Sequence, residues 1–366
     1  MSHTKIEDWG LGLTAPLVIA GPCSVETQAQ IQSMVEPMKK MREVQLFRGG
    51  VWKPRTRPGN FEGLGEKALE WMVDFREASG IPVTVEIGNA QHAEAALKAG
   101  IDVLWIGART TVNPFSVQEI AEVLRGTNVP VMVKNPLNPD LQLWLGALER
   151  LEAVGIRKLA AIHRGFADAY DKRFRNKPNW SMAIHLKREW PGMQVINDPS
   201  HICGKREMIQ EVAQKAMNYG LDGLMIETHP NPDQAWSDAA QQITPAKLEE
   251  ILASLDYRKV IEDQTSDEHL NQFRWIVDHL DKQLLDLLSE RFEVIDQIGE
   301  FKRERKLAVF QPDRWQEVMN SRIEEGLKKK MSEKFMKNLL FAIHEESVKR
   351  QEFQISKKST LNNAIS

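Results

Sequence analysis

Short apolar runs recur along the first two thirds of the chain, and each is followed by a polar turn and a stretch of helical composition. The continuous apolar character of these runs suits strands covered on both faces, as in a parallel sheet. The segments between them, such as 61–78, 91–99 and 205–219, have the length of crossover helices. Eight runs follow this pattern: LVIAGPC (17–23), LFRGG (46–50), VTVEI (83–87), VLWIG (103–107), VMVKN (131–135), LAAIHRG (159–165), QVINDPS (194–200) and GLMIETH (223–229).

Eight strand–helix units predict an α/β fold, a (β/α)8 TIM barrel over residues 1–253. Gly80, Gly100 and Gly220 stand where three of the helices should end. A doubly wound sheet is the alternative, but no GxGxxG motif follows the first run. The first strand is expected at Leu17, which leaves no room before it for an N-terminal regulatory domain.

The pattern changes in the last third of the chain. Residues 254–265 are predicted to form a charged linker, and residues 266–366 a smaller all-α domain. From Thr265 to Arg305 there is one glycine and no proline, and apolar residues recur at helical spacing. Such a helix is about 60 Å long, at roughly 1.5 Å per residue, and is much longer than a small domain is wide.

Two shorter helices are predicted after it, over residues 313–330 and 333–353, behind Pro312 and Ser332. Helices of such unequal length cannot cover the long one alone. We therefore expect two chains to interlock as a homodimer through this domain, with a higher homo-oligomer also compatible. A plain dimerising bundle accounts for the apolar stripe.

Composition narrows the classes of function. The 366 residues include 48 basic and 51 acidic ones, so nothing draws the whole chain to nucleic acid or to a membrane. Two cysteines make no disulfide framework, and the sequence contains neither a membrane-spanning apolar run nor a signal peptide. A cytoplasmic protein is expected, in which any anion binding is local.

Cations gather at the ends of the apolar runs. Because the carboxyl ends of barrel strands form one mouth, these cations are expected to surround one site. A lone arginine at a strand end is a structural ion pair about as often as a ligand contact, but five cations favour a substrate with several negative charges. The five are Lys53, Arg55, Arg109, Lys134 and Arg164.

A second group of residues at the same mouth suits a metal ion. Cys23, His201, Glu227 and Asp238 supply a thiolate, an imidazole and two carboxylates, a mixed set suited to Mn²⁺, Fe²⁺, Co²⁺ or Zn²⁺. Each of them alone is more often structural. Cys203 lies two residues past His201 and is interpreted as a neighbour, not a ligand.

Together the motifs GPCSVE, RGGVWKPRT, GART, HRG, DPSH and GLMIETHPNPDQAWSD resemble type I beta 3-deoxy-D-arabino-heptulosonate 7-phosphate (DAHP) synthase over residues 15–250. The resemblance implies condensation of phosphoenolpyruvate with erythrose 4-phosphate, giving DAHP and phosphate. It implies a divalent metal, Mn²⁺ before Fe²⁺, Co²⁺ or Zn²⁺, which polarises the aldehyde. The implied roles are metal ligation by Cys23, His201, Glu227 and Asp238, phosphoenolpyruvate binding by Arg109, Lys134 and Arg164, catalysis by Lys53 near the reacting centre, and erythrose 4-phosphate binding by Arg55 and Thr56.

A related family, 3-deoxy-D-manno-octulosonate 8-phosphate synthase, shares this barrel. It typically carries an Ala-Asn pair where the present chain reads KPRT (53–56), so the four-carbon aldose is favoured. Two features depart from the DAHP synthase pattern. Lys134 is followed by Asn135-Pro136-Leu137, and Arg57 stands where serine is common.

The helical third resembles the small all-helical chorismate mutase over residues 266–353, through LNQFRWIVDHLDKQLLDLLSER, IGEFK, QPDR and EESVKRQ. The resemblance implies a Claisen rearrangement of chorismate to prephenate without a cofactor. Trp315 and Gln311 depart from the family, where Glu and Asp are common. The implied roles are carboxylate binding by Arg291, Arg314 and the partner's Arg274, hydrogen bonding to the ether oxygen by Lys302 and Gln351, and contact with the ring hydroxyl by Ser347.

Two hypotheses follow for the helical domain. The chain is a bifunctional enzyme of aromatic amino acid biosynthesis, with feedback from chorismate or prephenate. Alternatively, the domain only binds these compounds and regulates the barrel. A nonenzymatic oligomerisation tail is a third reading.

Overall fold

The computed structural model describes residues 3–53, 59, 61–257 and 268–356, without the side chains of residues 268–270 and 272. The predicted sites Arg55 and Thr56, the neighbouring Arg57, and Thr265, where the long helical stretch was expected to begin, lie outside the described residues. The chain divides into two compact units, Met1–Val260 and Ile261–Ser366, and each is described by itself.

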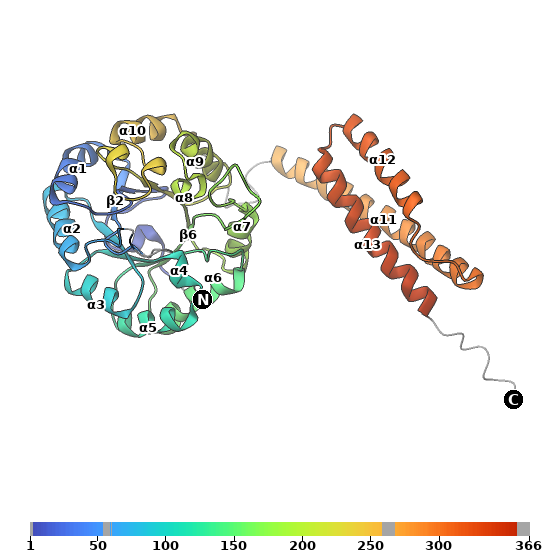
Figure 1. Cartoon of the computed structure of the whole chain (residues 1–366), viewed down its shortest axis with the longest axis horizontal. Helices are drawn as coiled ribbons and strands as arrows, with labels where there is room; N and C mark the ends of the chain where they lie inside the picture. Colours follow the sequence, from blue (N-terminus) through green and yellow to red (C-terminus); the bar gives the residue numbers. More distant parts are fainter. Residues whose placement is uncertain (1–2, 54–58, 60, 258–267, 357–366) are drawn as a thin grey trace. The chain divides into compact units, whose positions relative to one another are not determined.

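The first unit is a closed barrel of eight parallel strands in chain order, which confirms the predicted fold (Figure 1). The last strand pairs with the first, with Gly21 opposite Glu227, and this pairing closes the barrel. The strands are β1 (Leu17–Gly21), β2 (Val44–Gly49), β3 (Val83–Ile87), β4 (Val103–Ile106), β5 (Val131–Lys134), β6 (Leu159–His163), β7 (Val195–Asn197) and β8 (Gly223–Glu227).

Helices surround the barrel, and local side chains fix their ends. Thr27, Asn89 and Asp140 cap helices by accepting a hydrogen bond from a backbone N–H of the first turn. Gly80 ends α2 in the left-handed conformation, at φ +76°. The helices are α1 (Gln28–Lys40), α2 (Glu66–Ser79), α3 (Ala90–Lys98), α4 (Ala108–Thr111), α5 (Pro114–Leu124), α6 (Leu141–Ala153), α7 (Trp180–Glu189), α8 (Pro199–Cys203), α9 (Ile209–Asn218) and α10 (Pro245–Ser254).

The barrel has two apolar layers. The larger one lies between the strands and the surrounding helices, and the smaller one fills the barrel interior. The N-terminal segment belongs to the inner layer through Ile6, Trp9 and Leu13. It is attached beside the starts of β6 and β7, since the N–H of Ile6 donates to Gln194 and Lys158 donates to the carbonyl of Trp9. The amino ends of the strands are thus covered, and the carboxyl ends carry the polar side chains.

The second unit consists of α11 (Glu268–Arg305), α12 (Pro312–Lys328) and α13 (Glu333–Ser356). The predicted long helix is confirmed at 38 residues, and α13 continues three residues beyond the predicted Phe353. Arg350 pairs with Asp296 and thereby links α13 to α11. Apolar side chains of α11 remain exposed in this single chain, among them Phe273, Ile276, Val277, Leu280, Leu284 and Leu287.

Candidate active site

The predicted metal ligands and several of the predicted cations meet at the carboxyl ends of the strands. Cys23 follows β1, Lys53 follows β2, Lys134 ends β5, and Glu227 ends β8. His201 lies in α8, the short helix after β7, where the Asp198 side chain caps the helix by accepting from the His201 N–H. Residues as far apart in sequence as Cys23 and Asp238 are therefore neighbours in the fold.

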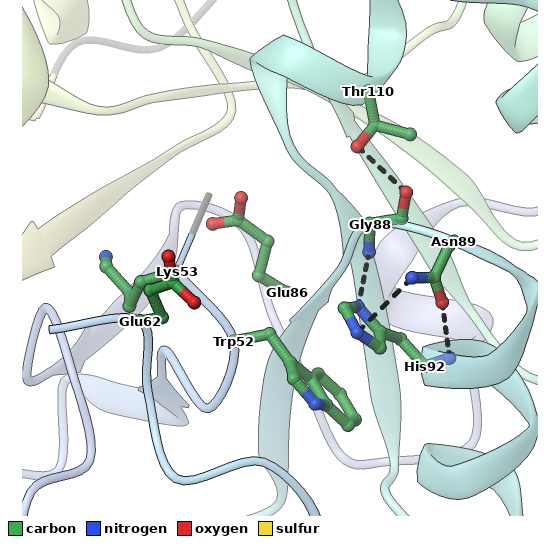
Figure 2. Close-up of a pocket in the computed structure, with 8 residues that line it drawn as sticks. All are labelled: Trp52, Lys53, Glu62, Glu86, Gly88, Asn89, His92 and Thr110. Atoms are coloured by element: carbon green, nitrogen blue, oxygen red, sulfur yellow. Dashed lines mark hydrogen bonds between the residues drawn. The ribbon is translucent and has the colours of Figure 1, made fainter. Parts of the chain in front are cut away.

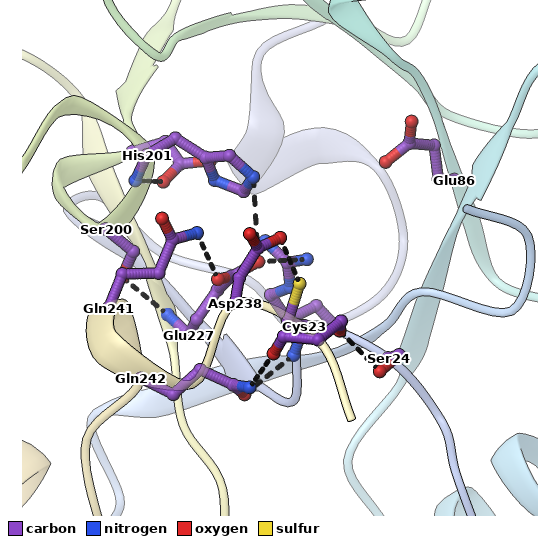
Figure 3. A network of polar contacts seen from close by, with 12 residues as sticks. Cys23, Ser24, Glu86, Ser200, His201, Glu227, Asp238, Gln241 and Gln242 are labelled. Atoms are coloured by element: carbon purple, nitrogen blue, oxygen red, sulfur yellow. Dashed lines mark hydrogen bonds and ion pairs between the residues drawn. The ribbon is translucent and has the colours of Figure 1, made fainter. Parts of the chain in front are cut away.

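The four predicted metal ligands form two contacting pairs (Figure 3). Cys23 Sγ is 3.3 Å from Asp238 Oδ2, and His201 Nε2 is 3.7 Å from Glu227 Oε1. Over the described part of the chain, no group of three or more His, Cys, Asp and Glu side chains is arranged so that it could hold a metal ion as it stands. The structure thus brings the predicted ligands together pairwise, and the ligand set stays a prediction.

Lys53 lies against the Cys23 side chain. Its ammonium is 3.0 Å from both the thiol sulfur and the carbonyl oxygen of Cys23. Burial, reinforced by the charge of Glu227, raises the pKa of the Cys23 thiol to about 12. Burial alone would lower the pKa of Lys53, but the charges of Cys23 and Glu227 outweigh it and raise this pKa. Lys53 is therefore a fixed cation at the mouth.

A buried carboxylate orients His201 and pairs with Lys134. Asp198 Oδ2 lies 2.8 Å from His201 Nδ1 and 2.9 Å from the Lys134 ammonium. Burial alone would raise the pKa of Asp198, but the neighbouring His201 and Lys134 hold it well below its usual range. Burial lowers the pKa of His201, so its imidazole is neutral near pH 7. The Nε2 atom of this imidazole faces Glu227.

Arg48 was not predicted from the sequence, yet it is completely buried in β2 at the centre of this site. Its guanidinium lies 3.0 Å from Glu227 Oε1 and 5.0 Å from the centre of the Trp105 ring. Burial raises the pKa of Glu227, but His201 and Arg48 outweigh it, so this pKa is lowered. A charged side chain inside a buried strand must be paired with an opposite charge. An arginine within an apolar run is therefore the sequence signal by which Arg48 is recognised.

The cations around the mouth differ in their surroundings. Arg164 is 6% exposed and donates to Asn176 Oδ1 at 2.8 Å, and burial lowers its pKa to about 10. Arg109, in α4, is exposed but close enough to contribute to the lowered pKa of Arg164. Asn135, at the unusual Asn-Pro-Leu sequence after Lys134, accepts from the Arg164 N–H and donates to the carbonyl of Gly165. Asn135 therefore holds the loop after β6.

A pocket of about 420 Å³ adjoins the Lys53 side chain (Figure 2). Trp52 and His92 stack on one side of it, with ring centres 4.1 Å apart and planes at 6°. The lining combines one cation, two carboxylates and uncharged polar groups, which suits a hydroxyl-rich molecule. It consists of Trp52, Lys53, Glu62, Glu86, Gly88, Asn89, His92 and Thr110.

The predicted residues of the helical unit come together in part. Arg291 on α11 donates to the Ser347 hydroxyl on α13 at 2.8 Å. Lys302 is buried and donates to the carbonyl of Val309 at 2.6 Å, and burial lowers its pKa. Gln351 is buried, and its Oε1 has no hydrogen-bond partner among the described residues.

Two further predicted cations are not joined to this group. Arg314 is exposed and pairs with Glu317, and Arg274 is exposed with its guanidinium 3.4 Å from Asn271. Trp315, where the resemblance leads one to expect Glu, stacks on His344 with ring centres 3.8 Å apart. Gln311 occupies the N-cap position of α12, and its side chain accepts no capping hydrogen bond from the described first turn.

The fold and site define a barrel enzyme whose mouth combines several cations with thiol, imidazole and carboxylate groups. Residues 6–262 match the family model described as the DAHP synthetase I family, and residues 273–352 match chorismate mutase type II. The chain therefore belongs to the DAHP synthetase I family and joins this barrel to a chorismate mutase domain. The two domains support a transferase and an isomerase activity in the shikimate pathway and aromatic amino acid biosynthesis.

The chain is similar to known proteins of two kinds. A phospho-2-dehydro-3-deoxyheptonate aldolase of Thermotoga maritima is 30% identical over 239 residues, which cover 65% of this chain and 68% of the relative. A 2-dehydro-3-deoxyphosphooctonate aldolase of Rhodopseudomonas palustris is 26% identical over 269 residues, covering 68% of this chain and 90% of the relative. Among solved structures, a DAHP synthase of Thermotoga maritima has a TM-score of 0.61 at 27% identity, covering 69% of this chain and 72% of that chain.

None of the helices in the described ranges is long and apolar enough to cross a membrane.

Proposed function

We propose that the barrel condenses phosphoenolpyruvate with erythrose 4-phosphate and one water molecule, which adds at carbon 2 of phosphoenolpyruvate, to give DAHP and inorganic phosphate. The observation that carries this proposal is the meeting of Cys23, Lys53, His201, Glu227 and Asp238 at one mouth. This combination suits an ion held beside anionic substrates, because thiol, imidazole and carboxylate groups are metal donors and a fixed ammonium attracts phosphate or carboxylate.

By chemical type, though not as a preformed cluster of three or more ligands in the described residues, these donor groups suit a divalent ion. Glu227 Oε1 is buried and accepts no hydrogen bond from the described residues, although it lies near Arg48 and His201. The neutral imidazole of His201 has its other ring nitrogen held by Asp198, an arrangement common among metal-ligating histidines. We propose that Cys23, His201, Glu227 and Asp238 hold the ion, with Mn²⁺ preferred. When bound, it supplies a Lewis acid that polarises the aldehyde carbonyl.

Different cations of the site then bind different anionic groups of the substrates. Lys134 and Arg164 are buried and Arg109 is exposed, and together they bind the phosphate of phosphoenolpyruvate. Lys53 stays protonated beside the reacting atoms. Arg48 extends this group of cations into the barrel, where it stabilises negative charge that develops during carbon–carbon bond formation. Arg55 and Thr56 are assigned to erythrose 4-phosphate by the resemblance alone.

The alternative for the barrel is 3-deoxy-D-manno-octulosonate 8-phosphate synthesis, which uses a five-carbon aldose phosphate. The relatives include 2-dehydro-3-deoxyphosphooctonate aldolases, so the choice of aldose rests on the KPRT sequence. Phosphate release is measured with phosphoenolpyruvate and either erythrose 4-phosphate or arabinose 5-phosphate. Turnover only with the four-carbon aldose is expected, and it should disappear with chelator and return with Mn²⁺. Preference for arabinose 5-phosphate would select the alternative.

For the helical unit, we propose rearrangement of chorismate to prephenate in an interlocked homodimer. Arg291, Arg314 and the partner's Arg274 bind the two carboxylates, and Ser347, which Arg291 already contacts, lies near the ring hydroxyl. Lys302 and Gln351 donate hydrogen bonds to the ether oxygen as charge develops on it. The exposed apolar side chains of α11 support the dimer, since burying them requires another surface.

We also propose feedback between the two units. Chorismate or prephenate bound to the helical unit lowers the rate of the barrel. The competing hypothesis, a helical unit that regulates without catalysis, predicts that the full chain binds chorismate but forms no prephenate. An assay of the full chain with chorismate separates the two, and synthase rates with added prephenate test feedback. If replacing Arg291 or Lys302 by alanine changes neither activity, the unit is an oligomerisation domain instead.

A further inference from the structure

Two residues outside the proposed ligand set connect the two carboxylate ligands. One amino group of Arg175, Nη1, lies 2.9 Å from Asp238 Oδ1 and 2.6 Å from Gln241 Oε1. Gln241 in turn donates from Nε2 to Glu227 Oε2 at 2.6 Å, a contact visible in Figure 3. A continuous hydrogen-bonded bridge therefore runs from Asp238 through Arg175 and Gln241 to Glu227.

The bridge occupies one oxygen of each carboxylate. The opposite oxygen of Asp238, Oδ2, faces Cys23 Sγ at 3.3 Å. The opposite oxygen of Glu227, Oε1, lies 3.0 Å from the Arg48 guanidinium and faces His201 Nε2 at 3.7 Å. A hydrogen bond to one oxygen restricts the rotation of a carboxylate, and it therefore also restricts the direction of the other oxygen. The bridge thus helps to orient both carboxylates toward the thiol and the imidazole, together with Arg48 at Glu227.

The rest of the fold holds Arg175 in place. Its backbone N–H donates to the carbonyl of Cys203, and its side chain lies over Gly204, where an added Cβ would approach Arg175 Cβ to 2.5 Å. The next residue, Asn176, donates to the carbonyl of His201 at 2.7 Å. The loop that carries Arg175 is therefore attached to the helix that carries His201.

The bridge also holds a residue in an unusual backbone conformation. Asp238 has φ +47°, in the left-handed region that residues other than glycine rarely adopt. Such a conformation persists only when the surrounding contacts determine it. The ion pair with Arg175 is one of these contacts, so it stabilises both the backbone and the carboxylate of Asp238.

We propose that Arg175 and Gln241 are positioning residues that act as one unit to orient Asp238 and Glu227 for a divalent metal ion. This inference rests on the proposed function of the site. Residues that orient metal ligands contribute 10- to 100-fold to metal affinity in comparable sites, since a ligand that is already oriented loses less freedom when the ion binds. The opposite possibility is that Arg175 competes with the ion for Asp238, in which case its removal would tighten metal binding.

The test measures binding of Mn²⁺ to the purified full chain after chelator treatment and desalting, through the electron paramagnetic resonance signal of free Mn²⁺. Arg175→Ala and Gln241→Leu should each raise the Kd by about 10- to 100-fold. The Kd of the double variant should equal that of the single variant that binds Mn²⁺ less tightly, because both residues belong to one bridge. Arg175→Lys should recover part of the affinity, and with Co²⁺ the visible absorption bands of Arg175→Ala should differ from those of the wild type.

Arg173→Ala is the matched control, because Arg173 lies on the same loop but pairs with the exposed Glu211. It should leave the Kd within about twofold, and thermal unfolding of the metal-free variants shows whether each one folds. Wild-type affinity in both Arg175→Ala and Gln241→Leu, tighter binding, or a double loss equal to the product of the single losses would overturn the inference. If the wild type binds no Mn²⁺, or if His201→Ala binds it equally well, the proposed metal site itself fails.

Discussion

Replacing Arg48 by methionine tests the electrostatic design of the site. Arg48 and Glu227 are both completely buried and lie 3.0 Å apart, so the substitution leaves a buried carboxylate without its main nearby guanidinium. Breaking a buried ion pair by removing one partner costs about 3–5 kcal/mol. For a unit of this size, in which each kcal/mol corresponds to about 2–4 °C, the melting temperature of the barrel should fall by roughly 6–20 °C.

The stability difference between the wild type and Arg48→Met should depend on pH. The pKa of Glu227 is lowered in the folded protein, so its stabilising contribution is present above the unfolded pKa, about 4.3, and is lost as the pH falls through the folded pKa. Without Arg48, Glu227 takes up a proton at a higher pH, which relieves the penalty. The difference between wild type and Arg48→Met should therefore be large at pH 7 and smaller near pH 4.

The assay is thermal unfolding of the full chain followed by calorimetry and tryptophan fluorescence, with a double variant and a control. Arg48→Met/Glu227→Gln removes both charges and should recover most of the loss. Lys67→Met removes a cation that lies 5.6 Å from the Trp71 ring at the surface, and it should cost less than about 1 kcal/mol. If Arg48→Met melts within about 2 °C of the wild type at pH 7, the ion pair does not stabilise the barrel as described.

Three other substitutions examine separate parts of the molecule. The pKa of Asp198 is lowered in the folded state, so the stability of the wild type should fall as the pH drops below about 4. Asp198→Asn no longer offers a carboxylate to Lys134, so guanidinium denaturation of this variant should lose this part of the pH dependence. Trp144→Ala removes a buried indole that donates to a strand carbonyl, and it should lower the free energy of unfolding by about 3–5 kcal/mol in the same experiment. Leu284→Glu places a charge on the exposed apolar side of α11; light scattering should then detect monomers, and chorismate turnover should fall at least tenfold, while a dimer of unchanged activity would contradict the proposed interface.

The fold could be predicted because buried parallel strands leave a simple trace in the sequence. The run VTVEI at 83–87 coincides with β3, whereas the run at 194–200 contains a strand of only three residues. There the strand ends early because Asp198 caps a short helix that begins at Pro199. Helix caps of this kind depend on single side chains. When only the sequence is known, the residues of such a cap are easily counted as part of the preceding strand.

The site was predicted less completely, for a different reason. Motifs indicate residues at strand ends, but they do not show what surrounds those residues. Arg173 and Arg175 stand two positions apart in one polar loop, and the sequence does not distinguish them. In the structure, one pairs with the surface residue Glu211 and the other with Asp238. Such contacts join segments more than 30 residues apart, so only the folded chain reveals them.

The closing seam of the barrel has a consequence for biosynthesis of the protein. β1 and β8 are neighbours in space but stand at opposite ends of the barrel sequence, and Cys23 and Glu227 are attached to them. A ribosome releases the chain from its N-terminus, so seven strands emerge before the eighth can complete the ring. The proposed metal centre can therefore form only after nearly the whole barrel has been translated, and a truncated chain carries the thiol without its carboxylate partners.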